Sequence, residues 1–228
     1  MGPRGGTGER RPLVPLDAYG RVLAAVLLAV GWTIASPEAA WSRAVTVALF
    51  AGTVFVAFRA SGVRGPVAGG VLVALGVAVV AAVLWEAAGE PAVTVVVGLA
   101  LVLASLGAIV RRLAAHPVVT TSTVAGALTV YLLVGMLFTF LFATIDLAVE
   151  EPILRGVGVA RLGDFLYHSF ITLTTVGYGD VAPGTDAMRA ISVLEALIGQ
   201  LYLVTIVAVT VARMGTRRRG PEEDRSVS

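Results

Sequence analysis

Seven consecutive residues, Thr-Thr-Val-Gly-Tyr-Gly-Asp at 174–180, interrupt two long apolar runs near the end of the chain. Glycine, tyrosine and aspartate at this density form a poor helix. A non-helical backbone at membrane depth is tolerated only where it is buried in protein or lines a water-filled path. The stretch is therefore either a turn outside the membrane or the working part of the molecule.

The chemistry that this stretch could perform is the binding of a dehydrated monovalent cation by main-chain oxygens. Backbone carbonyls can replace the hydration oxygens of such an ion when successive carbonyls point the same way. Alternating left- and right-handed dihedrals align them, and glycine adopts a positive φ without steric cost. Gly177 and Gly179 supply that alternation, so the oxygens that would face one axis are the carbonyls of Thr175, Val176, Gly177 and Tyr178, with the Thr175 hydroxyl below them. One chain supplies one strand of this lining, so four copies are needed to close a ring.

The composition indicates an integral membrane protein. The chain has 228 residues, of which 57% are hydrophobic and 14% are charged, whereas a soluble domain is about one quarter charged. The absence of cysteine excludes disulfides and thiolate metal sites. His116 and His168 lie far apart and indicate no metal cluster. The chain shows no nucleophile–base pair and no phosphate-binding loop, so we expect neither an enzyme nor a nucleic-acid-binding protein, and no small-molecule substrate is identified.

The apolar runs predict an all-α membrane protein, because each run has about the 20 residues needed to cross a bilayer core of roughly 30 Å. The predicted spans are 21–36, 43–60, 67–87, 92–110, 122–148 and 187–212. Residues 161–174, RLGDFLYHSFITLT, are apolar but too short to span, which favours a re-entrant helix that leads into the opening stretch. Residues 149–160 are predicted to form a loop.

The arginines predict the orientation of these spans. All 17 basic residues are arginine. With the N-terminus inside, the outer segments hold only Arg43, Arg155, Arg161 and Arg189, and the other thirteen lie on the inner side, as the positive-inside rule requires. We therefore expect a multi-pass protein of the cell membrane with both termini cytoplasmic. An alternative treats the first span as a cleaved signal peptide, which would leave the later topology unchanged.

The stretch TTVGYGD resembles the selectivity filter of the potassium channel family. The segments around it resemble that family's pore module, which consists of an outer helix, a re-entrant pore helix, the filter and an inner helix, over about residues 121–213. The resemblance implies a tetrameric, potassium-selective, passive channel, with K⁺ as the transported ion and no other cofactor. It divides the chain into an N-terminal tail (1–17), a four-helix transmembrane domain (18–115), a pore domain (116–213) and a C-terminal tail (214–228).

The resemblance also implies roles for single residues. Thr175, Val176, Gly177, Tyr178 and Gly179 match the potassium-binding filter residues. Thr174 matches the base of the filter, and Asp180 matches the acidic residue at its outer mouth. Gly199, nineteen residues past Asp180, matches the hinge glycine of the inner helix, for which close helix packing is the alternative interpretation.

The chain departs from the family at the pore helix. Many members carry two adjacent tryptophans where this chain has Tyr167 and His168, and Ile171 stands at a position that is acidic in some bacterial members. We hypothesise that Tyr167 bonds to Asp180 and supports the filter. We hypothesise further that His168 lies near the Tyr178 hydroxyl of its own or a neighbouring chain, with interfacial packing or a pH-sensing role as alternatives.

Glu195 is the one acidic residue well inside a span. Intramembrane carboxylates are rare and need partners. We interpret Glu195 as a polar anchor to the back of the pore helix, through a hydroxyl there; the alternative is a protonated, packed residue with no role in conduction.

The four N-terminal spans resemble the layout of voltage-gated channels but lack the charge that voltage sensing needs. Residues 92–110 contain no charged side chain, and Arg111 and Arg112 stand at the inner end as topology anchors. We therefore expect no steep voltage gating. The alternatives to a potassium-selective homotetramer in contact with membrane lipid are a less selective cation channel and an ion-translocating or regulatory subunit of a larger potassium transport system.

Overall fold

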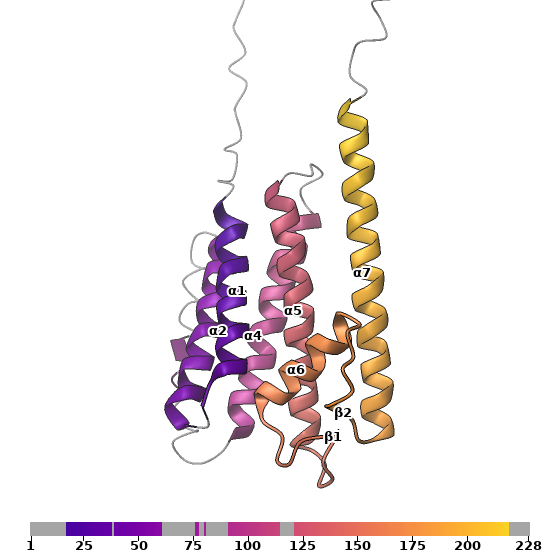
Figure 1. Ribbon diagram of the computed structural model, residues 1–228. Helices are drawn as coiled ribbons and strands as arrows, with labels where there is room; N and C mark the ends of the chain where they lie inside the picture. The colour runs from indigo at the N-terminus through magenta and orange to yellow at the C-terminus, as the bar shows by residue number, and fades with distance from the viewer. Residues whose placement is uncertain are drawn as a thin grey trace, which may run out of the picture.

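The structure is a computed structural model that describes residues 17–37, 39–60, 76–77, 80, 91–114 and 121–218. Its helices are α1 (Asp17–Ala35), α2 (Ala40–Ala60), α4 (Pro91–Ala114), α5 (Thr121–Asp146), α6 (Leu162–Leu173) and α7 (Asp186–Arg218). Two short strands, β1 (Leu154–Arg155) and β2 (Ala182–Pro183), form an antiparallel pair. α1 begins and α7 ends at one end of the molecule, and the β1–β2 pair lies at the opposite end (Figure 1).

The described helices follow the predicted spans one, two, four, five and six, and α6 coincides with the predicted re-entrant helix. The predicted span 67–87 lies outside the described residues apart from residues 76, 77 and 80. Within the described ranges, three helices contain stretches long and apolar enough to cross a membrane: Ala92–Arg111, Val124–Asp146 and Asp186–Val209. The apolar stretches of α1 and α2, Tyr19–Ala35 and Ala44–Ala57, are shorter.

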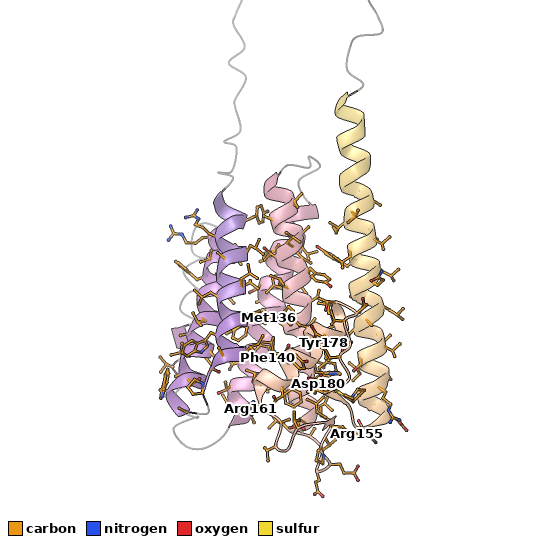
Figure 2. The ribbon with its side chains drawn as sticks, in the orientation of Figure 1. Met136, Phe140, Arg155, Arg161, Tyr178 and Asp180 are labelled. Carbon is orange, nitrogen blue, oxygen red and sulfur yellow. The ribbon has the colours of Figure 1, made fainter. Side chains whose placement is uncertain are left out.

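The main hydrophobic core joins α1, α2 and α4 to α5. Phe140 of α5 is 1% exposed and packs edge-on against Phe50 of α2, with ring centroids 5.0 Å apart. Its ring also covers Gly98 of α4, where a Cβ would lie 2.2 Å from a ring carbon. Met136 and Phe140 lie in the middle of the helix bundle (Figure 2). The N-terminal helices are thus packed tightly on the helix that opens the C-terminal half.

The same core reaches α6. Leu166 of α6 is fully buried and belongs to the cluster that contains Val22 and Val26 of α1. At the start of α6, a Cβ on Gly163 would lie 3.2 Å from the Thr33 carbonyl oxygen, so the end of α1 approaches α6 closely. α1 therefore packs directly against α6.

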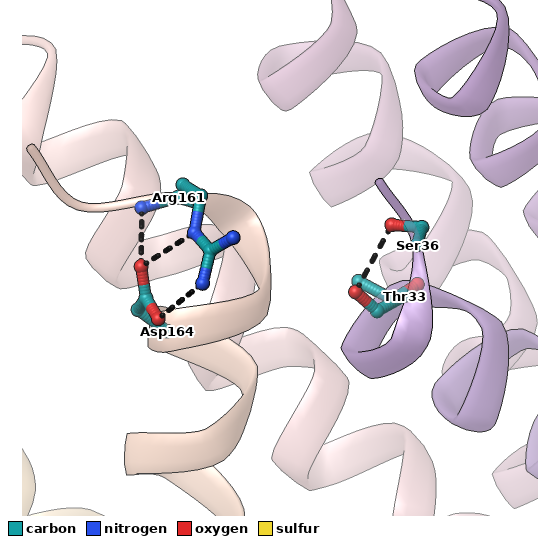
Figure 3. Close-up of polar contacts among 4 residues, drawn as sticks. All are labelled: Thr33, Ser36, Arg161 and Asp164. Carbon is teal, nitrogen blue, oxygen red and sulfur yellow. Dashed lines mark hydrogen bonds and ion pairs between the residues drawn. The ribbon is translucent and has the colours of Figure 1, made fainter. Parts of the chain in front are cut away.

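Local capping explains where α6 begins. The Asp164 carboxylate accepts hydrogen bonds from the backbone N–H of Arg161 at 2.9 Å and from its Nε at 3.3 Å (Figure 3). An acidic side chain in the first turn also complements the helix dipole. In the same view, the Ser36 hydroxyl donates to the Thr33 carbonyl at 3.3 Å at the end of α1.

The predicted loop 149–160 is more ordered than expected. Its β1 strand pairs with β2, which follows the opening stretch, with Leu154 opposite Pro183 and Arg155 opposite Ala182. The backbone N–H of Gly184 also donates to the Ile153 carbonyl at 2.7 Å. Backbone pairing of this kind carries little side-chain pattern, which is why the sequence indicated only a loop.

Candidate functional site

The backbone at 174–180 has the alternation that the paired glycines predict. Gly177 has φ +52° and Gly179 has φ +81°, and Thr175 has φ +59°, while the intervening residues stay at negative φ. A positive φ at a residue other than glycine costs about 1–2 kcal/mol, so Thr175 holds a strained conformation. Such strain persists where surrounding structure enforces it and is common at functional sites.

The end of α6 fixes the start of this segment. The Thr174 hydroxyl donates to the Phe170 carbonyl at 2.6 Å, and the backbone N–H of Gly177 donates to the Ile171 carbonyl at 3.0 Å. Val176 and Tyr178 are 52% and 72% exposed in the single chain. Figure 2 shows Tyr178 on the stretch that connects α6 with α7. The segment is thus anchored at its base and open along its length.

Tyr167 and Asp180 are in contact, as hypothesised. The Tyr167 hydroxyl donates to Asp180 Oδ2 at 2.8 Å. This hydrogen bond lowers the pKa of Asp180 below its ordinary value and raises the pKa of Tyr167. The Tyr167 ring also stacks on Tyr178, with centroids 6.5 Å apart and planes 4° from parallel. One side chain of α6 therefore contacts both the acid and the tyrosine of the segment.

Gly156 holds the outer end of the segment. Its φ is +92°, and a Cβ there would lie 1.8 Å from the Asp180 carbonyl oxygen. Only glycine fits both the conformation and the space. The turn after β1 therefore packs backbone to backbone against Asp180.

His168 has different partners from those hypothesised within its own chain. Its Nε2 lies 3.0 Å from Ser192 Oγ of α7, and its ring packs edge-on against Phe142. Tyr178 stacks on Tyr167 instead. Contact of His168 with a neighbouring chain's Tyr178 stays a prediction.

Glu195 lies where the anchor interpretation put it. It is fully buried, and its Oε1 is within hydrogen-bond distance of the Ser169 hydroxyl on α6. Ser169 Oγ also lies 2.7 Å from the Gly135 carbonyl oxygen of α5. Three helices therefore meet at one serine hydroxyl.

Gly199 allows close packing. A Cβ at Gly199 would lie 2.6 Å from the Leu173 carbonyl oxygen and 2.7 Å from Leu173 Cδ1. The Tyr131 hydroxyl of α5 donates to that same carbonyl at 3.0 Å. This geometry fits the packing interpretation of Gly199, whereas its role as a gating hinge stays a prediction.

Sequence reasoning missed Tyr131, Gly135 and Gly156. The partners of Tyr131 and Gly156 are backbone atoms distant in sequence, which no local pattern reveals. At Gly135 a Cβ would lie 2.9 Å from the Phe170 ring. The one sign of this close contact in the sequence was a glycine inside an apolar run. Among the residues that the structure describes, no group of three His, Asp or Glu side chains could hold a metal ion.

Comparison with known families identifies the class of this segment. The family model described as ion channel matches residues 126–216, which include most of α5, all of α6 and most of α7. Neither the curated proteins nor the solved structures compared with the chain gave a match. The C-terminal part of the chain is therefore an ion channel domain. That family is one of channels and not of enzymes, which confirms the expectation that the protein is not an enzyme.

Proposed function

We propose that this protein is a potassium-selective channel that conducts K⁺ passively through a filter formed by residues 175–179 of four identical chains. The observation that carries the proposal is the alternation of positive and negative φ from Thr175 to Gly179 at the end of α6. Alternation of this kind aims successive carbonyl oxygens at a common axis, where they replace the hydration shell of an ion. We call residues 175–179 the filter, α6 the pore helix, α5 the outer helix and α7 the inner helix.

The exposed face of the inner helix supports assembly into a homotetramer. Large apolar side chains of α7 that are about half exposed or more in the single chain are Val193, Leu194, Leu197, Leu201, Val204 and Val207. Lipid alone could cover these side chains, but one chain supplies only one quarter of a ring. We therefore assign part of this face to contacts between copies and to the lining of the pore.

The supporting residues hold the filter in this proposal. Thr174 anchors its base, Tyr167 and Asp180 bond at its outer end, and Glu195 ties the inner helix to the pore helix. His168 holds the same two helices together through Ser192. Gly199 lets the inner helix approach the end of the pore helix.

We propose further that membrane voltage has little leverage on this channel. Each elementary charge that crosses the membrane contributes about 2.3 kcal/mol per 100 mV. Residues 92–110 of α4 carry no charged side chain, and α1, α2 and α4 pack on the outer helix. In the proposed topology both termini are cytoplasmic and the filter faces the outside of the cell membrane.

Reconstituted flux tests the proposal. Vesicles containing the purified protein should take up K⁺ and Rb⁺ down a gradient, exclude Na⁺ and lose flux on addition of Ba²⁺. Alanine at Gly177 or Gly179 should lose this selectivity because both have a positive φ, and Gly158→Ala is the matched control, because Gly158 lacks a positive φ while a Cβ at all three positions meets nothing within 4 Å. Equal flux of Na⁺ and K⁺ would indicate the less selective channel, and absence of flux from a tetramer would indicate a subunit of a larger system.

A further inference from the structure

The meeting point of the three pore-domain helices contains more acceptor oxygens than the serine between them can satisfy. Ser169 Oγ lies 2.7 Å from the Gly135 carbonyl oxygen and also within hydrogen-bond distance of Glu195 Oε1. A serine hydroxyl has a single proton to donate and two lone pairs that accept. The Gly135 carbonyl can only accept, and it also accepts from the Thr139 hydroxyl at 2.9 Å, but that proton does not lie between Gly135 and Ser169. A second proton is therefore needed along the line from Gly135 through Ser169 to Glu195.

That proton has one place to reside. If the Ser169 hydroxyl donates to Gly135, its contact with Glu195 is a hydrogen bond only when Glu195 is the donor. If Ser169 donates to Glu195 instead, two acceptor oxygens face each other at 2.7 Å with no proton between them. We propose that Glu195 is a neutral carboxylic acid that donates its proton to Ser169, which donates in turn to the Gly135 carbonyl.

The surroundings of Glu195 agree with a neutral acid. The side chain is 0% exposed, and its second oxygen, Oε2, has no hydrogen-bond partner. In the described part of the chain, Arg161 pairs with Asp164 and Arg189 pairs with Asp186, and Glu195 is in neither ion pair. A buried carboxylate without a cation and with an unpaired oxygen is strongly unfavourable, whereas a neutral acid leaves only one weak acceptor unpaired.

Two titratable side chains on the helices packed around Glu195 bond to other partners. His168 Nε2 lies against Ser192 Oγ, and the Tyr131 hydroxyl donates to the Leu173 carbonyl. The chain of donors therefore runs in one direction, from Glu195 on α7 through Ser169 on α6 to Gly135 on α5. It crosses all three helices of the channel domain behind the filter.

This inference deepens the proposed function and rests on it for its consequence. Glu195 acts as a positioning residue: through Ser169 it fixes the inner helix to the pore helix, whose end carries the filter. A neutral donor suits this place because a charge behind the filter would alter the field that K⁺ experiences, whereas an acid proton supplies the hydrogen bond with no net charge.

Infrared difference spectroscopy of the reconstituted protein at neutral pH tests the location of the proton. We expect a carbonyl band of a protonated carboxylic acid that shifts in D₂O and is absent from Glu195→Gln. In Ser169→Ala the band should move to higher frequency, because the acid loses its acceptor. Carboxylate bands alone at this position would overturn the inference, and the D₂O shift of the wild-type protein keeps the test valid if a variant fails to fold.

Matched substitutions test the positioning role. Glutamine keeps a donor of the same length. The K⁺ flux of Glu195→Gln should therefore stay within about twofold of wild type, and the assembled variant should unfold at a temperature close to that of wild type. Leucine has similar bulk and no donor, so Glu195→Leu should lose about tenfold in flux, the factor that corresponds to about 1.4 kcal/mol. Equal flux from the leucine and glutamine variants would overturn the positioning role.

The two arms separate this inference from the proposed function. Vesicles that passed Na⁺ as readily as K⁺ would contradict the potassium filter while leaving the acid band of Glu195 in place. A missing acid band in a protein with potassium-selective flux would overturn only the neutral state of Glu195.

Discussion

At the scale of single residues, Tyr167 and Asp180 form the contact that joins the pore helix to the outer end of the filter. Their hydrogen bond is 2.8 Å long and is accompanied by stacking of Tyr167 on Tyr178. The bond is between a phenol and a carboxylate, so it is strongest when Asp180 is ionised. External pH should therefore act on the filter through this pair.

Tyr167→Phe should make the channel more sensitive to acid. The hydrogen bond from Tyr167 lowers the pKa of Asp180, so its contribution to stability is present above the ordinary aspartate pKa and is lost as pH falls through the lowered value. Without the hydroxyl the pKa of Asp180 returns toward its ordinary value, and acid inhibition should begin at a higher pH. The measurement is K⁺ flux against external pH, with Glu151→Gln in the neighbouring loop as control. Identical acid profiles of Tyr167→Phe and wild type would contradict the role of this bond.

Gly156→Ala should destabilise the protein while Gly158→Ala should not. Alanine at the positive φ of Gly156 costs about 1–2 kcal/mol, and its Cβ would also overlap the Asp180 carbonyl oxygen, 1.8 Å away. Gly158, two residues on, has nothing within 4 Å of the same position. Thermal unfolding of the two variants measures the difference, and equal midpoints would show that the turn does not pack on the filter.

At the scale of elements, the pore helix is held from two sides. Tyr131 of the outer helix and Gly199 of the inner helix meet the Leu173 carbonyl at its end, and Leu166 is buried among side chains of α1. α1 therefore contributes part of the packing that fixes the pore helix.

Gly199→Ala should separate the packing role of this glycine from a hinge role. A Cβ there would lie 2.6 Å from the Leu173 carbonyl oxygen, and overpacking of this kind costs about 1–3 kcal/mol. Gly107→Ala in α4, where nothing lies within 4 Å, should be neutral or stabilising by up to about 1 kcal/mol. Thermal unfolding of closed channels checks both. A Gly199→Ala variant that unfolds like wild type yet opens less often would favour the hinge.

Leu166→Ala tests the contact between the N-terminal helices and the pore helix. Leu166 is 0% exposed, so truncation should cost about 2–5 kcal/mol of stability and weaken ion selectivity. Leu103→Ala, at a position 50% exposed on α4, serves as the matched control and should change little. Unaltered stability and selectivity of Leu166→Ala would mean that the N-terminal helices are peripheral.

The sequence was informative where a structural requirement is local. The apolar runs indicated the described helices, and Gly177 and Gly179 indicated the alternating backbone, because glycine marks a positive φ. Nothing in the sequence indicated that Thr175 shares that conformation, since threonine rarely adopts it. The sequence also could not predict the pairing of β1 with β2 or the hydrogen bond from Tyr131 to the Leu173 carbonyl. In each case the partner is a backbone atom 27 or more residues away.

At the scale of the whole molecule, the chain combines an ion channel domain over residues 126–216 with N-terminal helices packed against it. Large apolar side chains remain exposed along α7 in the single chain, Leu201 at 66% among them. Copies of the chain and lipid together would cover them. The proposed assembly is a tetramer in which residues 175–179 of four chains enclose one axis.

The reversal potential of the current tests this account most directly. Purified protein in a planar bilayer, with K⁺ high and Na⁺ low on one side and the reverse on the other, should carry a current that reverses close to the K⁺ equilibrium potential, because carbonyl oxygens of the filter replace the hydration shell of K⁺. The conductance should vary little with voltage. A current that reverses near zero voltage, with Na⁺ as permeant as K⁺, would contradict the potassium filter on which the account depends.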